Sequence, residues 1–202
     1  MHKIILASAS PRRKKLLQQL NIPFEVHPST KDESYDPDLS PEEIVQQLAL
    51  QKANDIASHY DNSLVIGADT VVVFNETILE KPKDRHEAKR MLKELGNHTH
   101  YVFTGVALSK TGDSNNITDS VTFFEKTEVM FGNISSDDID RYVASGSPMD
   151  KAGSYGIQDD FGAVFVKGIN GDYYNVVGFP LHRFYNIMRT FAPEFLAYAK
   201  YD

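Results

Sequence analysis

The segment Ser8-Ala9-Ser10-Pro11-Arg12-Arg13 carries side chains suited to binding phosphate. It follows a short apolar strand, and Ser10 is a favourable N-cap for a helix that begins with proline. The N–H groups and the dipole of a helix N-terminus attract anions, and two guanidinium groups stand beside them here. The segment is predicted to bind phosphate, although a capped surface helix with solvated arginines fits the pattern equally well. The phosphate-binding candidates are Ser8, Arg12 and Arg13.

A second candidate group is Asp69, which follows the apolar run from Leu64 to Ala68. Functional groups in open α/β sheets gather at the carboxyl ends of strands. Asp69 could therefore hold a metal ion or accept a proton from water, while a hydrogen-bonded turn aspartate is the more common result of this spacing. The sequence contains no cysteine, which leaves an oxygen nucleophile or water for any hydrolysis.

Two lysines could each place a positive charge on a phosphate. Lys52 lies on a predicted helix that begins at Ser40, and Lys81 lies in Leu79-Glu80-Lys81-Pro82. Most lysines are simply solvated, so each is a weak indication by itself.

The segment from Pro148 to Gln158 has two glycines that would let its backbone approach a ligand, and its terminal amide suits a base edge. A structural loop fixed by ion pairing of Asp150 and Lys151 is an equally good interpretation. His98 and His100 share a face of a predicted strand, but exposed strand histidines are more common than a metal pair, and neither is assigned a role.

Strand and helix patterns alternate along the chain and position these groups. Serine N-caps or proline predict helices that begin near residues 10, 40, 135 and 180, and a further helix is predicted to begin near Asp84. One long hairpin is predicted with arms at 101–109 and 117–131, and a second with arms at 163–169 and 172–177 around Asn170-Gly171. Helices combined with crossover and hairpin connections indicate an α/β protein with a mixed sheet in one domain.

The chain has 202 residues and a formal net charge of −7. That charge argues against binding along a nucleic-acid backbone, which depends on lysine and arginine, but a local site for a small anion remains compatible with it. The N-terminal apolar run is short and precedes its basic cluster, the reverse of a secretory signal, and no stretch approaches the roughly 20 apolar residues of a membrane span. We expect a cytoplasmic protein that contacts neither nucleic acid nor membrane.

Five motifs in order resemble the Maf family of nucleotide pyrophosphatases: SASPRR, GADTVVV, LEKP, PMDKAGSYGIQ and NGDYYNVVGFPL. The resemblance implies cleavage of a nucleoside triphosphate between its α- and β-phosphates, with a divalent cation, Mg²⁺ or Mn²⁺, as cofactor. It also implies an elongated mixed sheet flanked by helices, with two lobes around a central cleft in a single domain over residues 1–202, and a homodimer.

The resemblance extends to individual positions. Asp69 matches the family's general base, and Glu33 lies where the family has a carboxylate near the metal, so Glu33 and Asp69 are the metal candidates. Arg12, Arg13, Lys52 and Lys81 match its triphosphate-binding positions. Arg12, Thr70 and Gln158 match the branch that acts on dTTP and UTP.

The chain departs from the family pattern directly after Gln158, where it reads Asp159-Asp160-Phe161-Gly162 and is one residue longer. An acidic pair at that place could change nucleotide preference. The alternative function is a nucleotide-binding regulator of cell division or septum formation with little turnover.

Overall fold

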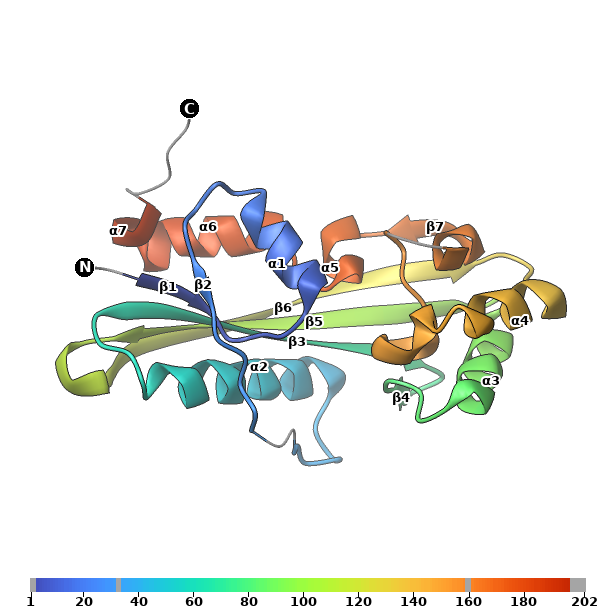
Figure 1. Ribbon diagram of the computed structural model, residues 1–202, viewed down its shortest axis with the longest axis horizontal. Helices are drawn as coiled ribbons and strands as arrows, with labels where there is room; N and C mark the ends of the chain where they lie inside the picture. The colour runs from blue at the N-terminus through green and yellow to red at the C-terminus, as the bar shows by residue number, and fades with distance from the viewer. Residues whose placement is uncertain (1–2, 32–33, 159–160, 197–202) are drawn as a thin grey trace. The chain divides into compact units, whose positions relative to one another are not determined.

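The computed structural model describes residues 3–31, 34–158 and 161–196 (Figure 1). The chain forms two compact units. Unit 1 comprises Met1–Asp69, Thr104–Glu125 and Gly178–Asp202, and unit 2 comprises Thr70–Phe103 and Lys126–Val177. None of the helices in the described part of the chain combines the length and the apolar character that a bilayer crossing demands.

The sheet is mixed, as the sequence predicts. Its order is β2-β1-β3-β5-β6-β7, with β4 paired to β3. The β1 strand pairs in parallel with β2 and β3, whereas β3 pairs with β4, and β6 with β7, in antiparallel. The strands are β1 (Lys3–Leu6), β2 (Glu25–Val26), β3 (Ser63–Phe74), β4 (Thr77–Leu79), β5 (Thr99–Thr111), β6 (Ile117–Phe131) and β7 (Val166–Asn170).

The helices begin where the capping signals predict. Ser10, Ser40 and Ser135 each accept a hydrogen bond from the backbone N–H three residues later, and Ser40 forms a full capping box with Glu43. The helices are α1 (Pro11–Gln18), α2 (Pro41–Ala57), α3 (Arg85–Leu95), α4 (Ser136–Ala144), α5 (Tyr173–Val177), α6 (Leu181–Phe191) and α7 (Pro193–Leu196). Short 3-10 turns η1 (Asp113–Asn115), η2 (Ser147–Asp150), η3 (Ala152–Ser154) and η4 (Phe161–Phe165) complete the elements.

In unit 1, α2 lies directly against the sheet because glycine faces it on two strands (Figure 1). A Cβ atom on Gly67 of β3 would stand 2.1 Å from the carbonyl oxygen of Ala49, and one on Gly105 of β5 would stand 2.2 Å from that of Val45. The contact surface also includes fully buried Ala53. Small residues on both sides therefore allow the helix backbone to touch the sheet.

In unit 2, α3 and α4 cover a separate apolar core. Leu92 and Leu95 of α3 meet Tyr142 and Val143 of α4 around Val129 of β6. The buried residues of each helix recur every three or four positions, so each helix has one apolar face, as the sequence pattern predicts.

The predicted second hairpin is wrong in its second arm. In the first arm, residues 166–169 belong to β7 whereas residues 163–165 belong to η4, and in the second arm residues 173–177 form helix α5. Asp172 caps this helix through a hydrogen bond to the N–H of Tyr174, and buried Asn175 donates to the carbonyl of Val102 and to Thr127 Oγ1. Tertiary hydrogen bonds thus outweigh the strand propensity of the tyrosine and valine residues.

Substitution of Gly67 by Ala should lower the free energy of unfolding by about 3 kcal/mol, since the added methyl group meets helix backbone that cannot move alone. Urea unfolding followed by circular dichroism measures the change. Gly132→Ala is the matched control, because its Cβ would find only ordinary contacts at 4.0 Å. Equal stability losses in both variants would contradict the proposed close contact.

Candidate active site

The turn between β1 and α1 is held by an arginine from within the segment itself. Arg13 Nη1 donates to Ser8 Oγ at 3.2 Å, and Arg13 Nε donates to the carbonyl of Gly178 at 3.0 Å. Ser8 Oγ also accepts from the N–H of Ser10 at 3.3 Å. Arg13 therefore joins the helix N-terminus to the segment that precedes α6.

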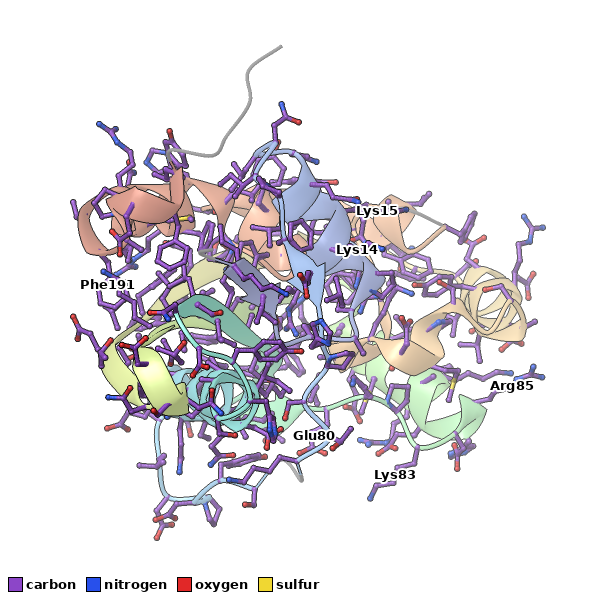
Figure 2. All side chains as sticks on the ribbon, turned by 60° about the vertical axis from the view of Figure 1, so that its left-hand side comes forward. Lys14, Lys15, Glu80, Lys83, Arg85 and Phe191 are labelled. Atoms are coloured by element: carbon purple, nitrogen blue, oxygen red, sulfur yellow. The ribbon has the colours of Figure 1, made fainter. Side chains whose placement is uncertain are left out.

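The other cations of α1 differ in exposure. Arg12 is partly buried, whereas Lys14 and Lys15 are exposed (Figure 2). Since only the first turn of a helix offers its N–H groups and positive dipole, Arg12 is better placed than the two lysines to act on an anion at the turn. The predicted phosphate cradle thus has a fixed arginine, Arg13, next to a partly buried one.

Asp69 and Lys52 form a close ion pair. Lys52 Nζ lies 2.6 Å from Asp69 Oδ1, and the two side chains are 13% and 10% exposed. Lys52 is one helical turn from Ala49, at the point where α2 touches β3. The close approach at Gly67 is what brings the ammonium group of α2 to the carboxylate of β3.

The strand register relates the turn after β1 to the apolar run of β3. Leu6 pairs with Ile66, and the N–H of Ala7 continues the ladder with a 2.8 Å bond to the Ile66 carbonyl. One residue further, Ser8 comes level with the end of the apolar run that precedes Asp69. The predicted groups Ser8, Arg13, Lys52 and Asp69 all belong to unit 1, where Arg13 contacts Ser8 and Lys52 contacts Asp69.

In unit 2, Thr70 lies on β3 and Lys81 follows β4 by two residues. The antiparallel register pairs Val72, two residues after Thr70, with Leu79, two residues before Lys81. Thr70 is partly buried and Lys81 is exposed. Gln158, also partly buried, closes the loop that begins at η2.

The predicted metal carboxylate Glu33 lies outside the described residues. Within the described ranges no three His, Asp or Glu side chains gather as a metal-binding cluster. A single carboxylate is nevertheless compatible with Mg²⁺, which keeps several waters and takes further oxygen ligands from substrate phosphates. Asp69 fits that requirement.

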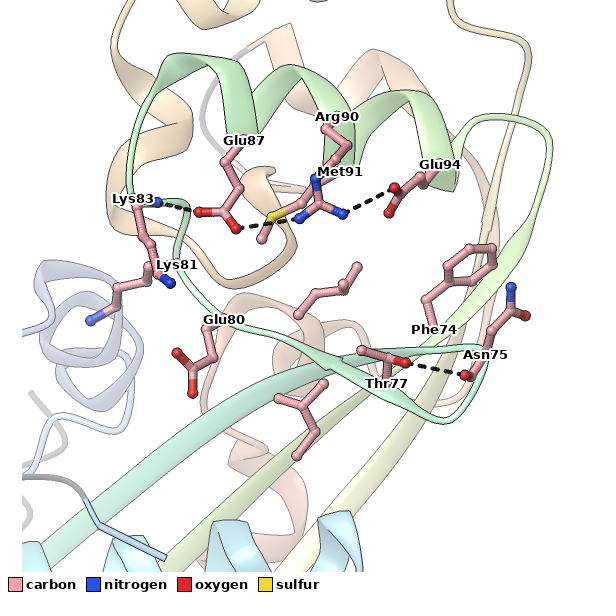
Figure 3. A pocket seen from close by; sticks show the side chains of 12 residues that line it. Phe74, Asn75, Thr77, Glu80, Lys81, Lys83, Glu87, Arg90, Met91 and Glu94 are labelled. Atoms are coloured by element: carbon pink, nitrogen blue, oxygen red, sulfur yellow. Dashed lines mark hydrogen bonds and ion pairs between the residues drawn. The ribbon is translucent and has the colours of Figure 1, made fainter. Parts of the chain in front are cut away.

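A pocket of about 470 Å³ borders Lys81, between β4 and α3 (Figure 3). Its lining includes three carboxylates, Glu80, Glu87 and Glu94, and three cations, Lys81, Lys83 and Arg90. Arg90 lies between Glu87 and Glu94 at 3.3 and 3.0 Å. Because these charges balance, the pocket does not suit a triphosphate.

His100 is fully buried, which corrects the expectation of an exposed strand histidine. Its Nε2 lies 2.8 Å from Tyr155 Oη, and its ring packs edge-on against Phe131. Burial lowers the pKa of His100 to about 4. Its Nδ1 has no hydrogen-bond partner within the described residues. The histidine is part of the unit 2 core and does not bind a metal with His98.

The sequence model of the Maf family, described as Maf-like protein, matches residues 3–191. A dTTP/UTP pyrophosphatase of Bacillus cytotoxicus is 50% identical over 191 residues, which are 95% of this chain and 96% of that protein. The dTTP/UTP pyrophosphatase of Halalkalibacterium halodurans is 51% identical over 183 residues, which are 91% of this chain and 93% of that protein. The chain belongs to the Maf family.

Among solved structures, a HAM1 protein from Coxiella burnetii aligns with a TM-score of 0.47 and 15% identity, over 76% of this chain and 86% of that one. A similarity of this size has no bearing on function.

The buried state of His100 predicts a pH-dependent stability. An unfolded histidine titrates near pH 6.5, so the unfolded state binds more protons than the folded state between about pH 6.5 and 4. The free energy of unfolding should fall by about 3 kcal/mol as pH decreases through that range. In urea unfolding, His100→Gln should reduce the dependence of the free energy of unfolding on pH, whereas substitution of the exposed His98 by Gln should leave that dependence unchanged. A wild-type slope in His100→Gln would exclude His100 as the cause.

Proposed function

We propose that this protein is a nucleoside triphosphate pyrophosphatase that hydrolyses dTTP and UTP to the monophosphate and pyrophosphate. Half of its residues are identical to those of dTTP/UTP pyrophosphatases over nearly the full length of both chains. The observation that supports the proposal is the nearly buried ion pair of Asp69 with Lys52, in the same unit as the turn between β1 and α1 that Arg13 fixes. Hydrolysis at phosphorus needs these parts, and it needs no covalent nucleophile.

Each of these residues is proposed to have a separate role in the reaction. The helix N-terminus and Arg12 bind phosphate oxygens, and Arg13 fixes the turn that presents them. Asp69 accepts a proton from a water molecule, whose oxygen forms the new bond to the α-phosphorus. The bond from that phosphorus to the bridging oxygen breaks, and pyrophosphate leaves with the electron pair.

Lys52 is proposed to serve both the base and the substrate. Its 2.6 Å contact with Asp69 Oδ1 fixes the direction in which the carboxylate points. The same ammonium group has three donors, so it can hold Asp69 and also reach a phosphate oxygen. Lys81 is the second cation proposed for the triphosphate.

Glu33 and Asp69 are the residues we propose to hold a divalent cation, Mg²⁺ or Mn²⁺. Both supply carboxylate oxygens, the ligands that these hard cations prefer. When bound, such a cation offsets phosphate charge and lowers the pKa of a coordinated water.

Arg12, Thr70 and Gln158 are proposed to set the preference for dTTP and UTP. An amide side chain presents one acceptor and two donors, which can pair with the carbonyl and N–H edge shared by uracil and thymine. The sequence predicts that Asp159 and Asp160 could change the nucleotide preference. Both residues lie outside the described residues. A single bilobed domain, a homodimer and a cytoplasmic location stay predictions.

A nucleotide-binding regulator of cell division with little turnover is the competing function. It predicts tight binding of dTTP or UTP without pyrophosphate release in Mg²⁺ or Mn²⁺. The carboxylate of Asp69 favours the enzyme, because a site that only binds an anion gains nothing from an acid group in the same unit.

Asp69→Asn should reduce pyrophosphate release from dTTP and UTP by about 10³-fold, since an amide cannot take the proton from water. A coupled assay with Mg²⁺ or Mn²⁺ measures the release. Asp119→Asn, at an exposed position of β6, is the control and should keep wild-type activity. Activity retained in Asp69→Asn would remove Asp69 from the role of base.

Arg13→Lys should raise the KM for dTTP about tenfold, because one ammonium group cannot reproduce the geometry by which the guanidinium bridges two sites. Steady-state kinetics and urea unfolding would be compared with Arg189→Lys, an exposed arginine on α6. An unchanged KM in Arg13→Lys would show that the cradle does not depend on the Ser8 and Gly178 contacts.

A further inference from the structure

The loop between α4 and η4 contains a buried lysine that the proposed reaction does not use. Lys151 is only 8% exposed. Its Nζ lies 2.6 Å from the Ser147 carbonyl, 3.0 Å from Ser147 Oγ and 2.8 Å from Asp150 Oδ1. An ammonium group has three donors, and these three acceptors match them. The ammonium group therefore binds within its own loop.

The aliphatic part of Lys151 supports the loop further along. A Cβ atom on Gly156 would stand 2.8 Å from Lys151 Cε and 3.1 Å from Cδ, so the backbone of Gly156 rests on this side chain. The backbone N–H of Gly156 also donates a hydrogen bond to Tyr142 Oη of α4, at 3.2 Å. Gly156 is thus fixed between Lys151 and α4, two residues before Gln158.

The same loop also contacts residues that lie close in sequence to Thr70 and Lys81, the other two unit 2 residues proposed to contact substrate. The N–H of Gly153 donates to the Glu80 carbonyl at 3.2 Å, directly before Lys81. A Cβ on Gly153 would meet Val72 at 3.0 Å, two residues after Thr70. Gly153 has a φ of +65°, a conformation that glycine adopts without strain. The loop therefore touches the neighbours of Thr70 and Lys81 and ends on Gln158.

We propose that Lys151 is a positioning residue for base recognition, which holds Gly156 and thereby places the Gln158 amide against the pyrimidine. The inference rests on the proposed function, because it assumes that Gln158 meets the base. It assigns Lys151 no part in proton transfer or phosphate binding. Loss of the cation should therefore weaken nucleotide binding and base discrimination while the chemical step continues.

Lys151→Met tests the proposal because it keeps the aliphatic stem and removes the charge. Asp150 is left well solvated, since its side chain is 59% exposed. The primary measurement is calorimetric binding of α,β-methylene UTP, which cannot be cleaved at the scissile bond. Affinity should fall about tenfold, because a displaced contact group loses much of its binding contribution. Lys167→Met, which removes an exposed lysine of β7, is the matched control.

Kinetics separate positioning from chemistry. In Lys151→Met the KM for UTP should rise about tenfold with kcat within about threefold of wild type, and the preference for UTP over CTP should shrink. A fall in kcat at unchanged KM, or wild-type values throughout, would overturn the proposal.

Gly156→Ala provides an independent variant if Lys151→Met fails to fold. It displaces Gly156 from the Lys151 stem but keeps the cation, and it should reproduce the loss of affinity and of UTP preference. Wild-type affinity in a folded Gly156→Ala protein would contradict the inference. A wild-type protein that binds the analogue but cleaves no UTP would refute the proposed function, and the binding comparison would still decide the role of Lys151.

Discussion

Much of the site depends on one steric constraint, the contact of α2 with the sheet at Gly67 and Gly105. A Cβ atom at either position would stand within 2.2 Å of a helix carbonyl oxygen, so the helix would have to move away from the strands. Lys52 of the helix would then move away from Asp69 of β3. The glycines of a buried sheet thus set the geometry of a polar pair, which links core packing to the proposed chemistry.

The sequence predicted the helix boundaries well because capping is local. Ser40 and Glu43 satisfy each other within one turn, so their spacing alone locates the start of α2. The helix α5 was missed because its hydrogen bonds come from distant strands, through Asn175 to Val102 and Thr127. The burial of His100 was missed for the same reason, since only the fold places Phe131 and Tyr155 around it.

The candidate site shows the same division between local and distant information. The motifs indicated Ser8, Arg13, Lys52 and Asp69 by residue type, but the pairing of Lys52 with Asp69 depends on how α2 meets β3. The motif PMDKAGSYGIQ left a ligand loop and an ion-paired loop open as alternatives. The structure contains the ion pair of Asp150 and Lys151, which bears out the second alternative, and a contact of this loop with a ligand stays a prediction.

The bond between Arg13 and Gly178 joins residues 165 positions apart in the chain. All of unit 2 lies between them in sequence, and unit 1 needs the segment that starts at Gly178. During synthesis the ribosome therefore releases every residue of unit 2 before Arg13 can meet its carbonyl partner. A nascent chain stalled before Gly178 would hold every residue of unit 2 but would lack the bond that fixes the turn between β1 and α1, so that turn is completed only late in synthesis.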